Sequence, residues 1–214
     1  IVCQRDYFGT IKSVALNGMW TAVLTNDGKV ALHPIEDTSG AEDVKFPQQA
    51  DGKPIVQMHM LDSFLILLDQ EGKVAIHLLD ESGQAPLITE HRGEHNPITK
   101  IWPNRRGTRI VCIDSTGNGY LYNPIDESKL LIPNFCAGTH DVIFDLDDRN
   151  LFITVDGENV HTYYHASLSI DGASIIHVPE YLKLEEIDKQ KPGVITLMDR
   201  DLKPIILKSG FIYS

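Results

Sequence analysis

An internal repeat is the feature that most restricts how this chain of 214 residues folds. The pattern around Gly28 returns around Gly72, and weaker copies follow around Gly117, Gly157 and Arg200. Copies spaced 40 to 45 residues apart are typical of architectures in which one supersecondary unit is stacked on the next. The five copies account for nearly the whole sequence, so we expect a repeat fold that forms one cooperative structure instead of several domains.

Each copy has the sequence form of a β-hairpin. An aliphatic and β-branched run is followed by a turn rich in Asp, Gly and Asn, and then by an alternating run. Glycine supplies the positive φ that tight turns need, and Asp or Asn side chains bond to turn amides. We expect these hairpins to be the two middle strands of blades, near residues 19–36, 64–80, 109–126, 151–165 and 193–208.

The predicted fold class is all-β, a β-propeller of degenerate WD-type repeats with about five four-stranded blades. Residues 1–214 are expected to form a single propeller segment, because a blade buries its faces only against neighbouring blades. The Gly-His and Trp-Asp dipeptides of regular WD repeats do not occur in the sequence. The start without Met and the untidy ends indicate a piece of a longer protein, and hence part of a larger or open ring. Residues 181–188 are interpreted as an outer strand and a turn.

Charge and cysteine content restrict the class of partner. A formal net charge of −11 repels a phosphate backbone, so nucleic acid is not an expected partner. Three cysteines form no paired pattern, which favours a reducing, cytoplasmic compartment over a disulfide framework. The apolar run at residues 64–68 is far shorter than the roughly 20 residues that span a bilayer, so no membrane span is expected.

Catalytic and cofactor motifs do not occur in the sequence. There is no Gly-x-Ser-x-Gly elbow, Walker-type loop or dinucleotide fingerprint, so we predict no enzyme activity and no cofactor. Spacing raises a metal hypothesis for two histidine pairs, His91 with His95 and His161 with His165. Residues four apart on a strand lie about 13 Å from each other, which is too far to share one ion. His91 and His95 are expected in a loop, where the geometry is freer, but a structural or solvated role is favoured there too. His33 and His77 occupy equivalent repeat positions, which also favours a structural role.

Charged residues in the turns are the candidate protein-binding residues. If the hairpins are middle strands, their turns line one face and form an acidic rim, which includes Asp27, Asp69, Glu71, Asp114, Asp156, Glu158, Asp199 and Asp201. Such a rim steers a basic partner. The opposite face gathers Arg105 and Arg106, a pair of the kind that interfaces favour, and the turn at residues 145–149. The simpler interpretation is that Asp and Gly are good turn formers.

Several segments resemble the WD repeat-containing protein 19 family, namely residues 29–36, 107–114, 119–124, 132–135 and 160–163. The resemblance covers most of the chain and departs from the family in turn lengths and over residues 167–191. It implies the second propeller of a subunit of intraflagellar transport complex A. It also implies other complex A subunits and membrane-receptor cargo adaptors as partners, and a location in the cytoplasm and in the cilium, at the ciliary base and along the axoneme. No family binding motif transfers residue by residue.

The function expected from these observations is a protein-interaction scaffold that supports retrograde transport in cilia and helps cargo to enter them. One alternative is a propeller of a coat-type or ubiquitin-ligase adaptor that recognises a peptide. Another is a hydrolase propeller, whose site would be assembled from loops remote in sequence.

Overall fold

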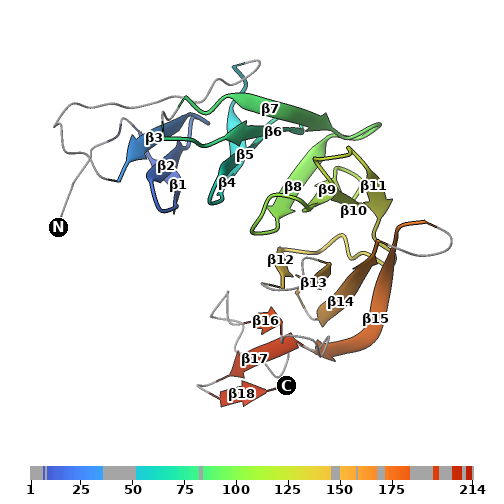
Figure 1. The fold of residues 1–214 in the computed structure, drawn as a ribbon. Helices are drawn as coiled ribbons and strands as arrows, with labels where there is room; N and C mark the ends of the chain where they lie inside the picture. Colours follow the sequence, from blue (N-terminus) through green and yellow to red (C-terminus); the bar gives the residue numbers. More distant parts are fainter. Residues whose placement is uncertain are drawn as a thin grey trace. The chain divides into compact units, whose positions relative to one another are not determined.

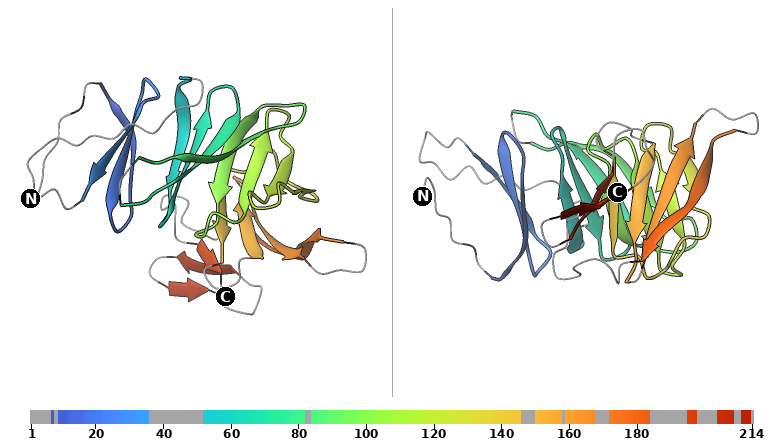
Figure 2. Two further views of the ribbon diagram at one scale, coloured as in Figure 1. Left: turned by 45° about the horizontal axis from the view of Figure 1, so that its top comes forward. Right: turned by 90° about the horizontal axis from the view of Figure 1, so that it is seen from below.

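The computed structural model describes residues 7, 9–35, 52–81, 84–145, 150–157, 159–167, 172–183, 195–197, 204–208 and 211–213, with side chains up to residue 177. Every helix or strand in these ranges is a β-strand, and the strands form antiparallel meanders in which sequence neighbours lie side by side (Figures 1 and 2). The all-β prediction is confirmed. The chain divides into two compact units, residues 1–100 and 101–214. A single propeller segment over the whole chain stays a prediction.

The described residues of the first unit form two sheets that lie wholly within it. The first sheet has strands β1 (Ile11–Leu16), β2 (Trp20–Thr25) and β3 (Val30–Pro34), in that order. The second sheet has strands β4 (Ile55–Met60), β5 (Phe64–Asp69), β6 (Lys73–Leu78) and β7 (Leu87–Arg92). Apolar side chains of the two sheets form one buried cluster, in which Leu24 and Leu32 of the first sheet join Leu65 and Leu67 of the second.

The other three sheets of the described residues belong to the second unit, except that the first strand of the third sheet already begins at Ile98, in the first unit. The third sheet has strands β8 (Ile98–Pro103), β9 (Ile110–Asp114), β10 (Gly119–Tyr122) and β11 (Lys129–Leu131). The fourth has β12 (Asp141–Phe144), β13 (Leu151–Val155), β14 (Asn159–Ala166) and β15 (Ser174–Lys183), and the fifth has β16 (Ile195–Leu197), β17 (Pro204–Lys208) and β18 (Phe211–Tyr213). Val111, Leu121, Phe152 and Tyr163 belong to the main buried cluster of this unit.

The repeated hairpins occupy the middle of each four-stranded sheet, as β5–β6, β9–β10 and β13–β14. Their first strands are almost completely buried, whereas the edge strands β1 and β7 are largely exposed. A strand covered on both faces reads as a continuous apolar run, which is why these segments lack polar alternation. The first strands of these hairpins, β5, β9 and β13, are therefore covered on both faces, as expected of the inner part of a blade.

In the first unit, a glycine of each hairpin turn lies against the segment that leads into the next sheet. Gly28 and Gly72 have φ of 79° and 81°. The Gly28 carbonyl accepts a hydrogen bond from the Ile55 N–H at 2.9 Å, and the Gly72 carbonyl accepts one from the Ile98 N–H at 3.4 Å. A Cβ on Gly28 would lie 2.6 Å from the Cα of Pro54. Only glycine fits there, because both the conformation and the close approach exclude a side chain.

Candidate protein-interaction surfaces

Two acidic turn residues, Asp69 and Asp114, hold their own turns. The Oδ1 atom of each carboxylate accepts hydrogen bonds from the backbone N–H groups two and four residues further along, all at 2.9 Å. Asp69 is buried and Asp114 is half-buried. The backbone donors of a tight turn need acceptors, and a carboxylate is a strong one. The main role of these two carboxylates is therefore to stabilise their own hairpin turns and not to bind a partner.

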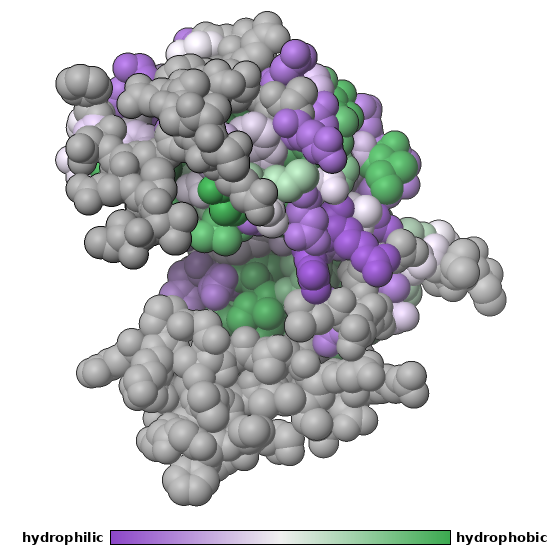
Figure 3. Space-filling model, turned by 60° about the vertical axis from the view of Figure 1, so that its left-hand side comes forward, coloured by the Kyte–Doolittle hydropathy of each residue, from purple (hydrophilic) through white to green (hydrophobic). Residues whose placement is uncertain are grey.

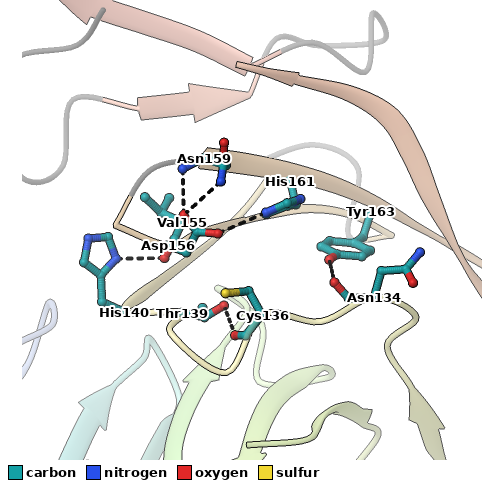
Figure 4. Close-up of polar contacts among 9 residues, drawn as sticks. All are labelled: Asn134, Cys136, Thr139, His140, Val155, Asp156, Asn159, His161 and Tyr163. Atoms are coloured by element: carbon teal, nitrogen blue, oxygen red, sulfur yellow. Dashed lines mark hydrogen bonds and ion pairs between the residues drawn. The ribbon is translucent and has the colours of Figure 1, made fainter. Parts of the chain in front are cut away.

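Asp156 occupies the same repeat position and is directed further inward. Its Oδ1 accepts a hydrogen bond from the Asn159 N–H at 2.6 Å, and its Oδ2 lies 3.1 Å from His161 Nε2 (Figure 4). Only 10% of its side chain is exposed. Both carboxylate oxygens are used inside the fourth sheet, so the main role that the geometry assigns to Asp156 is structural.

The loop that precedes the fourth sheet is hydrogen-bonded to the same region. The backbone N–H of His140 donates to the Val155 carbonyl at 2.9 Å. The His140 ring Nδ1 lies 2.8 Å from the same carbonyl oxygen, and the Tyr163 hydroxyl donates to the Asn134 carbonyl at 3.4 Å (Figure 4). Tyr163 stacks on Phe152 with 5.3 Å between ring centroids. Burial raises the pKa of Tyr163 to about 12, so the phenol stays protonated at neutral pH. The region around Asp156 is thus a bonded structural network.

Two other acidic residues, Asp27 and Glu71, face solvent. The Thr25 hydroxyl donates to Asp27 and the Lys29 ammonium lies 2.9 Å from its other oxygen; these contacts lower the pKa of Asp27 to about 2, the hydrogen bond more than the charge. Glu71 lies 2.7 Å from the Lys53 ammonium. Exposed ion pairs contribute little stability, but they reduce the local charge. The rim of the first unit is therefore less acidic than its carboxylates alone suggest.

Arg105 and Arg106 are exposed at the tip of the β8–β9 turn. Asn104 holds this turn, because its side-chain Oδ1 accepts hydrogen bonds from the N–H groups of Thr108 and Arg109 at 2.9 and 3.2 Å. In an antiparallel meander this turn lies at the opposite end of the third sheet from the turn that contains Asp114. The two arginines are thus presented by a fixed turn, away from the acidic turn of the same sheet.

Some predicted candidates lie outside the described residues. These are Glu158, Asp199 and Asp201 of the acidic rim, and most of the turn at residues 145–149. Residues 184–188 of the predicted outer strand and turn also lie outside, whereas residues 181–183 are the last part of β15. The binding roles of all the acidic and arginine candidates stay predictions.

The histidines are placed mainly in structural positions. His91 is buried in β7 while His95 is exposed in the following loop, and His165 Nδ1 lies 3.3 Å from the Asn150 side-chain oxygen. His77 is fully buried and its Nδ1 lies 2.8 Å from the Ala85 carbonyl; burial lowers its pKa, which favours the neutral ring. In the described part of the chain, no three His, Cys, Asp or Glu side chains gather closely enough to hold a metal ion.

Two pockets that we did not predict from sequence lie at equivalent places in the two units. The first encloses about 370 Å³ and is lined by Gly18, Met19, Trp20, Pro34 and Glu81. The second encloses about 160 Å³, and its lining includes Arg109, Asn123, Asp126 and His165. On the face shown in Figure 3, hydrophobic side chains reach the surface among hydrophilic ones.

Both pockets form where a middle hairpin begins and ends. Trp20 pairs across the hairpin with Pro34 in the first sheet, and Arg109 and Asn123 stand at the same repeat positions in the third sheet. Aligning the repeats could have found this position, because a large aromatic residue in one copy is replaced by a cation in another. The repeated backbone thus presents different chemistry at equivalent places.

Comparison with known families agrees with the repeated hairpins. Residues 1–194 match the family model described as the WDR19 second beta-propeller. The chain belongs to this family. The predictions of a WD repeat-containing protein 19 relative and of a β-propeller are thereby confirmed. The second-propeller family covers both units and reaches into the segment before β16.

The curated relatives include WD repeat-containing protein 19 of Homo sapiens, which is 29% identical over 181 residues, or 81% of this chain. The Mus musculus protein of the same name is 27% identical over 177 residues, or 80% of this chain. The aligned region spans 13% of the length of each relative. Membership of the second-propeller family therefore concerns one domain, and the similarity does not extend over the full length of the relatives.

Two solved structures share the fold at low sequence identity. Human WBSCR16 has a TM-score of 0.52 and 12% identity, with 75% of this chain and 49% of that chain covered. The computationally designed Ika8 protein has a TM-score of 0.53 and 10% identity, with 72% of this chain and 45% of that one covered. In the described ranges, no helix has the length and apolarity that a membrane crossing requires.

Proposed function

We propose that this chain is a protein-interaction scaffold, the second propeller of a subunit of intraflagellar transport complex A. In this proposal it supports retrograde transport in cilia and helps cargo to enter them. Its partners are the other complex A subunits and membrane-receptor cargo adaptors. It works in the cytoplasm, at the ciliary base and along the axoneme. Nucleic acid is not among its partners.

Membership of the second-propeller family over residues 1–194 is the observation that carries the proposal. The two relatives are named as WD repeat-containing proteins, and repeat proteins present extended binding surfaces. The exposed arginine pair Arg105 and Arg106 on its fixed turn is a suitable contact, because arginine is enriched among residues that dominate binding energy.

The chemistry of the described side chains supports binding rather than catalysis. Cys112 is fully buried, and burial raises the pKa of its thiol, which keeps it protonated and unreactive. The carboxylates of Asp69, Asp114 and Asp156 accept hydrogen bonds within their own turns. We therefore assign no catalytic step to this chain.

Affinity recovery from ciliated cells tests the proposal. The tagged chain is expressed and the complex A subunits that co-purify are quantified by mass spectrometry. We expect these subunits to be enriched over a tag-only control, and failure to recover any of them would overturn the proposal.

A double charge reversal tests the arginine surface. Arg105→Glu with Arg106→Glu should reduce recovery by roughly tenfold or more, as expected when a central contact is lost. Arg92→Glu with Lys100→Glu alters the same net charge at two other exposed positions and serves as the matched control. Equal losses in both double variants would show that net charge, and not this turn, controls recovery.

A further inference from the structure

We propose that the pocket of the first unit binds a peptide segment in which an aliphatic or aromatic side chain lies next to a Lys or Arg. The pocket is the one lined by Gly18, Met19, Trp20, Pro34 and Glu81, and we call it the Trp20 pocket. This inference goes beyond the proposed function, because it concerns a site and a ligand chemistry that do not depend on complex A.

The floor of the Trp20 pocket is apolar, and so are Met19 at its rim and Ile35, which follows the lining residue Pro34. Trp20 is 5% exposed, and its indole N–H donates to the Asp80 carbonyl at 3.1 Å, so the ring is fixed in the floor. Met19 and Ile35 are 40% and 43% exposed, and the Ile35 N–H donates to the Met19 carbonyl at 2.9 Å. This bond joins the two exposed residues across the β2–β3 hairpin. An apolar side chain that enters the pocket would cover surface that now faces water.

The walls of the pocket are already in place without a ligand. The side-chain oxygen of Asn17 accepts hydrogen bonds from the N–H groups of Met19 and Trp20 at 2.9 and 2.8 Å. Its side-chain N–H₂ donates to the carbonyls of Leu61 and Asp62 at 3.0 and 3.2 Å. One asparagine therefore ties the pocket turn of the first sheet to a loop of the second. A preformed site loses less entropy on binding than one that must first be ordered.

The negative charge at the pocket determines which residue of the peptide is favoured next to its apolar side chain. Among the described residues that line it, Glu81 is the ionisable one, and its side chain is exposed. Asp62 and Asp80, whose carbonyls take part in the bonds just described, are also exposed. A volume of about 370 Å³ is near the lower end for ligand pockets and admits about one or two side chains. An apolar anchor beside a cation matches both the floor and Glu81.

In the equivalent pocket of the second unit, the described lining also joins apolar residues, Leu121 and Leu130, to a carboxylate, that of Asp126, but a cation lies among them. Arg109 stands at the repeat position of Trp20, and Asp126 and His165 are also part of the lining. It has less than half the volume of the Trp20 pocket. An apolar and cationic segment is therefore expected to prefer the first unit.

An NMR titration of the ¹⁵N-labelled chain tests the proposal. Four synthetic eight-residue peptides carry Leu, Ile, Phe or Trp next to Arg in a Gly and Ser background. At least one of them should shift the Trp20 indole N–H signal saturably, while the Trp102 indole in the second unit serves as the internal control. The proposal is overturned if none of the four shifts the Trp20 signal. It is also overturned if peptides with Glu in place of Arg bind equally well.

A charge exchange at the rim makes the test specific. Glu81→Lys should weaken binding of the Arg peptides by roughly tenfold and improve binding of the Glu peptides. Glu127→Lys, the same change at an exposed position of the second unit, should leave both affinities unaltered. If the Glu81→Lys variant still prefers the Arg peptides over the Glu peptides, the charge at residue 81 does not determine which peptide binds. Recovery of complex A subunits is a separate measurement, so either proposal can fail alone.

Discussion

The hairpin turn of the first sheet differs from its counterparts in the second, third and fourth sheets. At the position where those sheets have Asp69, Asp114 and Asp156, the first sheet has Thr25. The three carboxylates accept hydrogen bonds from their own turns, whereas the acidic residue of the first turn, Asp27, is exposed and pairs with Lys29. The acidic residues of these turns therefore fall into two groups. Those of the first group stabilise the fold by accepting hydrogen bonds, and those of the second are exposed to solvent.

This difference separates structural from available charge. An inward carboxylate such as that of Asp156 loses turn and histidine hydrogen bonds if it is changed, so its substitution reports mainly on stability. An outward carboxylate such as that of Asp27 can be changed with little effect on the hairpin. Among the acidic candidates that the structure describes, Asp27 and Glu71 are therefore the two best placed to meet a partner.

The largest expected effect tests what the turns share, which is the close approach of a glycine to the next segment. Gly28→Ala should lower the free energy of unfolding by roughly 3–4 kcal/mol, because positive φ and overpacking against Pro54 both penalise a Cβ. Gly117→Ala should cost less, since its nearest neighbour is the side chain of Ala137. Denaturant unfolding measures both.

Gly52→Ala is the matched control for this experiment. Gly52 also has positive φ, 64°, but a Cβ there would meet nothing within 4 Å. We expect a loss of about 1–2 kcal/mol from conformational strain alone. Equal losses for Gly28→Ala and Gly52→Ala would show that the contact with Pro54 has no energetic importance.

A medium effect is expected where two carboxylates that hold their own turns, one buried and one half-buried, are exchanged for amides. Asp156→Asn should lower the free energy of unfolding by about 1.5–3 kcal/mol, because charge-assisted hydrogen bonds to Asn159 and His161 are weakened in a buried place. Asp114→Asn, in a half-buried turn, should cost about 0.5–1 kcal/mol. Urea unfolding at pH 7 compares them. If the two variants lose equal stability, burial does not distinguish the two turns.

The smallest effect concerns the titration of Asp27. Thr25→Val removes the hydrogen bond that contributes most to the lowered pKa, so the pKa of Asp27 should rise from about 2 toward 3.8. Because the folded pKa is depressed, the stabilisation is present above pH 3.8 and is lost as the pH falls toward 2. Carboxyl ¹³C NMR follows the titration of Asp27. The control is Thr116→Val, which removes a hydroxyl donor beside Asp114 and should leave the pKa of Asp27 unchanged. An unchanged pKa in the Thr25→Val variant would contradict the assignment.

The hairpins could be predicted from sequence because their signals are local. Gly28 and Gly72 mark turns that need positive φ, and the apolar runs before them need burial, so both the turn and the strands follow from a few adjacent residues. The division into two compact units has no such signal, since it depends on how residues far apart in the sequence pack.

The candidate sites were less predictable for the same physical reason. Exposure of Arg105 and Arg106 follows from their place in a polar turn. The inward direction of Asp156 depends on the half-buried ring of His161, and turn composition alone does not reveal it. The lining of the Trp20 pocket includes Glu81, in the connection between β6 and β7, a residue that no periodicity connects with Trp20.

The bonds from Gly28 to Ile55 and from Gly72 to Ile98 also bear on how the protein is made. Each joins a finished turn to a strand that follows soon after it in the chain, so the contact closes a short loop. As the polypeptide leaves the ribosome, the first hairpin is available before the second sheet is complete, and its turn offers an acceptor to the emerging strand. Each hairpin can thus serve as a template for the sheet synthesised after it.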